Sequence, residues 1–261
     1  MFRRLHDLLA YAPLGKIKEF LHDNTTFDVN MKFDARNWTP LHWASFGGSP
    51  DVVALILSLP GILVNETCEH GWTPFWLACF HSNCDVARVL LADPRVDVDM
   101  ADDYDMTPLW RASSFGSLKL IKSFIASGRD FAWERKGKVD RASQRVTPLE
   151  IAAFNCHPEV VSMLNRFFAD RVGTRREISL ELGMPDPLAA DLFATVVFLC
   201  DGFLNLRPSF VSSPSGRFFS IVSRLPMELQ MMMCWRLCGS AKQNIQSRDA
   251  EAAFRMLVRS S

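Results

Sequence analysis

The chain has 261 residues, of which 29 are Lys or Arg and 29 are Asp or Glu, so its formal net charge is zero. This balance argues against a strongly basic nucleic-acid-binding protein and against an acidic tail protein. Hydrophobic residues make up 48% of the chain and charged residues 22%, so the chain can bury a sizeable core. Its length fits one or two domains, and we expect a folded protein.

Compartment signals are weak but agree with one another. No stretch resembles a signal peptide. The longest uncharged apolar run near a candidate span, residues 192–200, is far shorter than the ~20 residues that a membrane helix needs. The seven cysteines are odd in number and scattered, as expected for reduced thiols used as small core residues. We therefore expect a soluble protein of the cytoplasm or nucleus, without membrane contact.

The first element in chain order is a degenerate helix pair within residues 4–33. Apolar residues recur there at helical spacing, but no Thr-Pro pair is present. A terminal unit of a repeat array must present a polar outer face, so a divergent unit is expected at this end. The apolar positions are Leu5, Leu8, Leu9, Ile17, Phe20 and Leu21.

Four blocks that begin with Thr-Pro and end with Ala follow. They occupy residues 39–44, 73–78, 107–112 and 147–152, and their threonines are 34, 34 and 40 residues apart. Thr-Pro favours the start of a helix, because threonine can cap free backbone N–H groups and proline loses no hydrogen bond in the first turn. Eight to thirteen residues after each alanine, an apolar stripe predicts a second helix. The unit is therefore a repeated helix pair.

This pattern resembles the ankyrin repeat over roughly residues 4–165. The resemblance implies an all-α fold, a solenoid of helix-turn-helix units with hairpin loops. Because one such unit cannot bury its apolar face alone, stability comes from stacking neighbours. The expected units lie near residues 4–33, 34–67, 68–101, 102–141 and 142–165.

The residues two positions before each threonine indicate tight hairpin tips. Asn37, Gly71 and Asp105 tolerate the left-handed backbone that such a tip often needs. Arg145 does not fit this rule, and it follows the longest of the three spacings. We expect about six extra residues to remodel the turn there.

One position within the blocks concerns the contact between units. The resemblance implies that His42 ties neighbouring repeats through hydrogen bonds. Trp76, Trp110 and Glu150 stand at this position in the other blocks. We therefore expect a solenoid held more by packing than by a polar ladder.

Aromatic residues cluster where the resemblance places the concave groove of the solenoid. Some stand directly before a threonine, and others at the end of the first helix of a unit. Exposed aromatic side chains are typical of interface hot spots. An alternative is that the phenylalanines pack between repeats and only the tryptophans are exposed. The candidate partner-binding residues are Trp38, Phe46, Trp72, Phe80, His81, Met106 and Phe115.

The insertion 129–145 carries six basic and three acidic residues together with Trp133. A basic loop with an aromatic residue can contact phosphates or nucleic acid. We favour a solvated loop, because the excess is only three charges and no nucleic-acid-binding module is recognisable. Nucleic acid is thus not the expected partner.

The repeat pattern stops near residue 166, and residues 166–261 are expected to form a helical region. Residues 170–176 are polar and predict a linker, and apolar residues at helical spacing predict a buried helix from Pro187 to Phe203. The motif Leu-Pro-x-Glu-Leu opens a final segment, 225–261, that resembles the start of an F-box.

The F-box resemblance implies recruitment of a ubiquitin ligase through a linker protein. An F-box-like element after ankyrin repeats is also similar to the arrangement in poxvirus host-range ankyrin proteins. The alternative, which we favour, is a helical domain that only caps the solenoid. The candidate ligase-docking residues are Leu225, Pro226, Glu228 and Leu229.

No motif for catalysis or cofactor binding is recognisable. Phosphate-binding glycine loops, nucleophile elbows and metalloprotease helices are absent from the sequence. Cys79, His81 and Cys84 offer no four-ligand set at zinc-finger spacing. We expect no catalytic residue, no metal and no cofactor, although an enzyme hidden in the carboxy-terminal region stays an alternative.

The sequence predicts a non-enzymatic, monomeric protein–protein interaction scaffold that binds a protein partner through the concave face. The more specific alternative is a substrate-recruiting adaptor of a cullin-type ubiquitin ligase.

Overall fold

The computed structural model describes residues 12–24, 27–32, 34–139, 144–184 and 230. The chain divides into two compact units, Met1–Ala169 and Asp170–Ser261. The described part of the first unit consists of helix pairs and one two-stranded sheet. Its elements are α2 (Leu14–Asp23), α3 (Pro40–Gly47), α4 (Pro50–Leu57), α5 (Pro74–Phe80), α6 (Cys84–Ala92), α7 (Pro108–Ser114), α8 (Leu118–Ser127), β1 (Gly137–Lys138), β2 (Arg145–Val146), α9 (Pro148–Phe154) and α10 (Pro158–Ala169).

Each Thr-Pro pair opens a helix, as predicted. The proline is the first helical residue of α3, α5, α7 and α9. In the last three, the threonine hydroxyl accepts the N–H of the third helical residue at 3.1 to 3.2 Å. This bond satisfies one of the free donors at a helix start.

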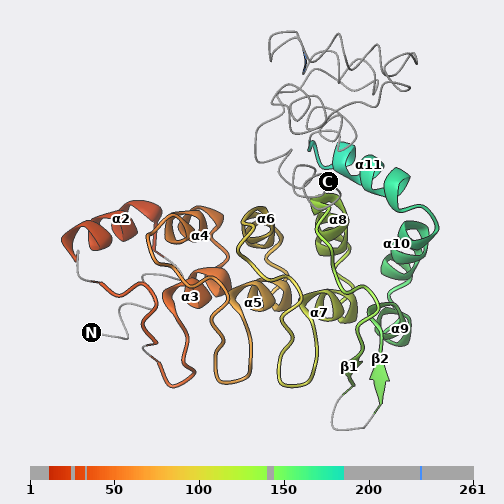
Figure 1. Ribbon diagram of the computed structural model, residues 1–261, viewed down its shortest axis with the longest axis horizontal. Helices are drawn as coiled ribbons and strands as arrows, with labels where there is room; N and C mark the ends of the chain where they lie inside the picture. The colour runs from red at the N-terminus through yellow and green to blue at the C-terminus, as the bar shows by residue number, and fades with distance from the viewer. Residues whose placement is uncertain (1–11, 25–26, 33, 140–143, 185–229, 231–261) are drawn as a thin grey trace, which may run out of the picture. The chain divides into compact units, whose positions relative to one another are not determined.

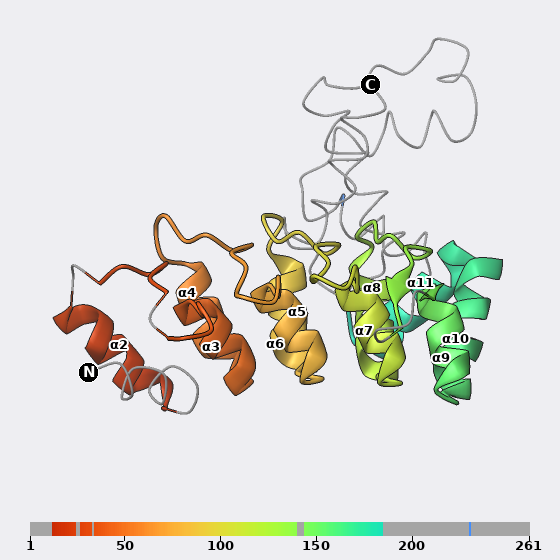
Figure 2. The same cartoon turned by 90° about the horizontal axis from the view of Figure 1, so that it is seen from below.

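The helices form two layers (Figure 1). In one layer α3, α5, α7 and α9 pack successively on one another, and in the other α4, α6, α8 and α10 do the same. Each first helix also packs on the second helix of its own unit, and α2 contacts α4. Seen from below, the successive pairs run roughly parallel (Figure 2). The predicted all-α solenoid is confirmed.

The hairpin tips adopt the predicted left-handed backbone. Asn37 has a φ of 59°, Gly71 of 74° and Asp105 of 58°. Arg145 instead lies in β2, where it pairs with Lys138 of β1 in an antiparallel ladder. The longer spacing is therefore absorbed by a short strand pair at this tip.

The insertion 129–145 contributes to the core. Phe131 and Trp133 are buried. Phe131 stacks on Phe124 of α8 at 4.9 Å between ring centroids, and Trp133 packs against Phe167 of α10 at 4.6 Å. The expectation of a solvated loop is wrong for Phe131 and Trp133, because their rings fill the space between α8 and α10.

Asparagine side chains join successive units in the loops that follow the second helices. Asn30 Nδ2 donates to the carbonyl oxygen of Gly61 at 2.8 Å, and one unit later Asn65 Nδ2 donates to that of Arg95 at 2.8 Å. Each asparagine Oδ1 also accepts a backbone N–H from the following unit. The asparagine amides thus form hydrogen bonds with backbone groups that lie outside the helices and would otherwise need water as a partner.

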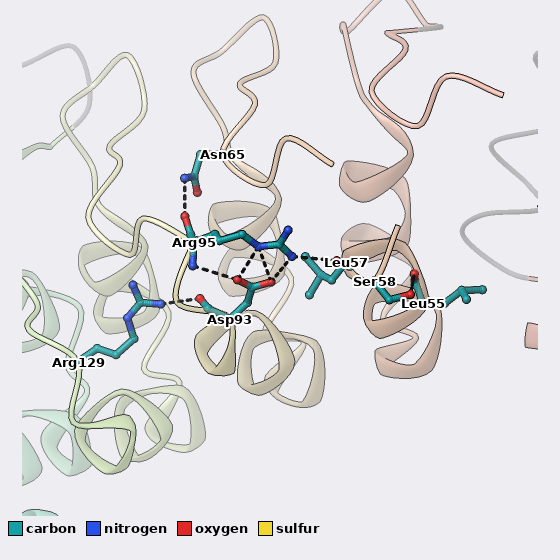
Figure 3. A network of polar contacts seen from close by, with 7 residues as sticks. All are labelled: Leu55, Leu57, Ser58, Asn65, Asp93, Arg95 and Arg129. Atoms are coloured by element: carbon teal, nitrogen blue, oxygen red, sulfur yellow. Dashed lines mark hydrogen bonds and ion pairs between the residues drawn. The ribbon is translucent and has the colours of Figure 1, made fainter. Parts of the chain in front are cut away.

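Two arginines extend this ladder (Figure 3). Arg95 donates to the carbonyl oxygen of Leu57, at the end of α4, at 2.8 Å and pairs with the Asp93 carboxylate at 2.6 Å. Arg129 donates to the carbonyl oxygens of Asp93, at 3.0 Å, and Val96. These bonds tie three consecutive units together on the side of the second helices.

In the second unit, α11 (Arg171–Glu181) covers most of the predicted linker. Asp170 caps it, because its Oδ1 accepts the N–H of Gly173 at 2.9 Å. The linker prediction for residues 170–176 is therefore wrong. The helix predicted from residue 187 and the segment 225–261 lie outside the described residues. Within the described ranges, no helix is both long and apolar enough to span a membrane.

Candidate functional site

His42 links the first two Thr-Pro units through hydrogen bonds to the backbone of both. Its Nδ1 accepts the backbone N–H of Thr39 at 3.2 Å and lies 2.8 Å from the Thr39 hydroxyl. Its Nε2 donates to the carbonyl oxygen of Trp72 at 2.9 Å. Burial lowers the pKa of His42 to about 4, so the ring is neutral at physiological pH. This geometry agrees with the structural role that the resemblance implied.

Two tryptophans continue the same ladder. Trp76 Nε1 donates to the carbonyl oxygen of Met106 at 3.0 Å, and Trp110 Nε1 donates to that of Val146 at 2.9 Å. Each acceptor directly precedes the next threonine, as Trp72 does for His42. The expected loss of the polar ladder is wrong, because an indole N–H replaces the imidazole N–H.

Glu150 keeps the other half of the histidine's role. Its Oε2 accepts the backbone N–H of Thr147 at 2.7 Å, which closes a capping box with the threonine hydroxyl. This hydrogen bond lowers the pKa of the Glu150 carboxyl. His42 both caps its helix and bridges to the next unit, whereas its replacements each perform one of these tasks.

Two of the predicted partner-binding residues are buried. Trp38 is 2% exposed and Met106 is 8% exposed. The Trp38 ring packs between Trp43 and Phe46, with centroid distances of 4.6 and 5.5 Å. The expectation that Trp38 is exposed is wrong, because the large ring fills space inside its own unit.

Three aromatic rings of the unit 68–101 stack on one another. Trp72 lies on Trp76 with 4° between the ring planes and 4.8 Å between centroids. Phe80 stacks against both, at 5.9 and 5.3 Å. Trp72 and Phe80 remain half-buried, so each still presents part of its ring to solvent.

The remaining predicted residues join this stack. His81, which is exposed, packs edge-on against Phe46 at 4.7 Å and against Phe80 at 4.9 Å. Phe115, 47% exposed, packs edge-on against Phe80 at 5.5 Å. Five predicted residues thus form one continuous surface, called here the aromatic strip. It consists of Phe46, Trp72, Phe80, His81 and Phe115.

Arg111 is part of this surface, although the sequence reasoning did not select it. Its guanidinium carbon lies 5.4, 4.9 and 5.0 Å from the ring centroids of Trp76, Phe80 and Phe115. These are favourable cation–π distances. The sequence did contain a signal for Arg111, because it is the one charged residue at a block position that is otherwise hydrophobic. The other three blocks carry Trp43, Leu77 and Ile151 there.

Two hollows open beside Trp72 and share it with His70. The Arg111 hollow, of about 660 Å³, lies between the second and third hairpin tips. The Arg36 hollow, of about 370 Å³, lies between the first and second. Their other lining residues are Trp76, Asp102, Tyr104, Met106 and Arg111 for the larger, and Arg36, Trp38, Phe46, Leu77, Phe80 and His81 for the smaller.

The titratable groups of the hollows have distinct roles. Burial raises the pKa of Asp102, and its Oδ1 accepts the N–H groups of Tyr104 and Met106 at 2.9 Å each. Asp102 therefore shapes the third hairpin. Burial lowers the pKa of His81, which favours its neutral form.

Catalytic and metal chemistry find no support in the described part of the chain. No group of three or more His, Cys, Asp or Glu residues is placed there to hold a metal ion. Burial raises the pKa of Cys79 well above its ordinary value, so its thiol is a poor nucleophile. His157 bonds the carbonyl oxygen of Ser114 at 3.0 Å, another contact between units. The four candidate ligase-docking residues lie outside the described residues.

The comparisons with known proteins agree with the first half of the solenoid. Residues 8–102 match the family model of ankyrin repeats, in three copies. These residues are thus similar to ankyrin repeats. The pairs α7–α8 and α9–α10 lie beyond the match and continue the same architecture, so the fold is an all-α ankyrin-repeat solenoid. No curated protein matches the chain. Ankyrin repeats generally mediate protein–protein interaction.

Proposed function

We propose that this protein is a non-enzymatic scaffold that binds a protein partner through the aromatic strip and the two hollows beside it. The observation that carries the proposal is the unbroken chain of ring contacts from Phe46 to Phe115. Each ring in this chain is either exposed or half-buried, so each can contact a partner. Large rings of this kind bury much area at low cost in conformational entropy.

Hydrogen bonds and cation–π contacts hold the aromatic strip in place, and this order favours tight binding. The ladder bonds from His42, Trp76 and Trp110 fix the backbone of the adjacent hairpins. Arg111 holds three rings from one side. A surface that is ordered before binding loses less entropy when the partner docks.

The test compares partners that copurify with the full-length protein and with a Phe80→Ala, Phe115→Ala double variant, measured by quantitative mass spectrometry. The matched control is Leu63→Ala, because Leu63 is 52% exposed but lines neither hollow. We expect specific partners to fall at least about tenfold on the double variant and to persist on the control. An unchanged partner set on a folded double variant would contradict the proposal.

The ligase-adaptor alternative rests on the sequence at residues 225–229 alone. A Leu225→Ala, Pro226→Ala double variant of the full chain tests it by the same method. Selective loss of ubiquitin-ligase components would favour the alternative, and their absence from both samples would favour a carboxy-terminal region that caps the solenoid. We propose a monomer of the cytoplasm or nucleus in either case.

A further inference from the structure

Arg36 differs from three other basic residues near the hairpin tips. Arg145 and Lys138 both contact the Asp105 carboxylate, at 2.8 and 3.7 Å, and Lys32 pairs with Glu66 at 2.9 Å. Arg36 is exposed and has no carboxylate partner within the residues that the structure describes. Its guanidinium carbon lies 5.4 Å from the ring centroid of Trp38, so the charge is held at the Arg36 hollow.

The ring under Arg36 carries a second donor without a partner. Trp38 Nε1 is buried and has no hydrogen-bond acceptor in the described part of the chain. Buried polar groups almost always have a partner. The indole N–H of Trp76, by contrast, is satisfied by Met106. Arg36 and the ring of Trp38 line the same hollow, and the guanidinium is the donor that a ligand can reach there, because Trp38 Nε1 is buried.

The rest of the lining of the Arg36 hollow is aromatic or aliphatic, apart from His70 and His81. Phe46, Leu77 and Phe80 line it together with Trp72. Burial lowers the pKa of His81 and favours its neutral form, and no carboxylate lines this hollow. Arg36 therefore gives it a positive charge, whereas in the Arg111 hollow the charge of Arg111 is opposed by Asp102. The surface complementary to the Arg36 hollow is an anionic group beside an apolar one.

We propose that the Arg36 hollow recognises an acidic side chain of the partner protein, with its carboxylate on Arg36 and a neighbouring aromatic or aliphatic side chain in the hollow. This inference rests on the proposed function and names the chemistry of the partner segment. A protein segment fits better than a nucleic acid, because Glu69 and Asp103 are exposed on the neighbouring hairpin tips and oppose a polyanion.

The test selects random twelve-residue displayed peptides on the full-length protein and measures the affinity of the selected peptides for variants. The variants are Arg36→Glu, Trp72→Ala and, as a charge-matched control, Lys119→Glu, since Lys119 is exposed on α8 and lines neither hollow. We expect selected peptides to carry Asp or Glu within two positions of Trp, Phe or Leu. They should bind Arg36→Glu about tenfold or more weakly and bind Lys119→Glu unchanged. Replacing the peptide's acidic residue by lysine should restore binding to Arg36→Glu.

The outcomes separate this inference from the proposed function. Peptides that need Trp72 but show no acidic preference, or that bind Arg36→Glu as well as the wild type, overturn the inference and leave the scaffold proposal standing. If every selected peptide binds Trp72→Ala as well as it binds the wild type, both the inference and the proposed function fail. Binding of a single-stranded oligonucleotide that is lost on Arg36→Glu also overturns the inference, because the hollow then serves a nucleic acid. Melting temperatures of the variants check folding.

Discussion

Trp76 Nε1 donates to the backbone carbonyl oxygen of Met106, one unit further along the solenoid, at 3.0 Å. His42 makes the corresponding bond to Trp72, and Trp110 makes it to Val146. One contact between units is therefore formed by two chemically different side chains. It anchors the backbone of the hairpins whose side chains line the hollows.

Removing this N–H should cost stability. In Trp76→Phe, the carbonyl oxygen of Met106 loses the indole donor and keeps only the N–H of Asp102, at 3.1 Å. We therefore expect the free energy of unfolding to fall by about 0.5–1.5 kcal/mol beyond the effect of ring size. Trp38→Phe is the matched comparison, because Trp38 Nε1 has no acceptor in the described structure. Loss of the Trp38 N–H should lower the free energy of unfolding clearly less. Urea unfolding measures both, and an equal or greater loss for Trp38→Phe would contradict the role of the ladder bond.

His42 should make the stability depend on pH. Its pKa is about 4 in the folded protein and near 6.5 when unfolded, so the unfolded state binds more protons between these values. The free energy of unfolding should therefore decrease as the pH falls from 6.5 to 4, by about 3 kcal/mol in total from this group. Protonation would also remove the Nδ1 acceptor of Thr39 N–H.

The measurement is urea unfolding at several pH values for the wild type and for His42→Gln. Most of the slope between pH 6.5 and 4 should be missing from the variant. Parallel curves for the two proteins would show that another group titrates in this range.

Asn83 should stabilise the end of α3 from the neighbouring unit. Its Nδ2 donates to the carbonyl oxygens of Ser45 and Phe46, at 2.9 and 3.1 Å. Asn155 makes a similar bond to Ser114 in a more exposed place. We expect Asn83→Ala to lower the free energy of unfolding by about 1–2 kcal/mol, and Asn155→Ala by less. Thermal unfolding of both variants checks the order, and the reverse order would contradict it.

The repeated helix pairs were predictable because they follow from local chemistry. Thr-Pro starts a helix wherever it occurs, and Asn37, Gly71 and Asp105 allow a left-handed turn whatever lies around them. The longer spacing before Thr147 correctly indicated a different turn, although strand pairing depends on a contact between Lys138 and Arg145 that no local pattern encodes.

The errors concern how side chains pack within and between units. A tryptophan can expose its ring, bury it or use its N–H, and the sequence does not say which. Trp38 fills space beside Trp43, Trp76 bonds a carbonyl in the next hairpin, and Trp133 packs on α10. Arg111 was overlooked because the sequence does not show that its guanidinium lies beside three aromatic rings.

The most direct test of the account is site-specific photo-crosslinking of the full-length protein. His81→p-benzoylphenylalanine places a photoreactive group on the aromatic strip, where the native side chain is exposed. Leu63→p-benzoylphenylalanine places the same group outside both hollows. The account predicts crosslinks to a protein partner from position 81 and none to that partner from position 63. Crosslinks from position 63 alone would contradict binding through the aromatic strip.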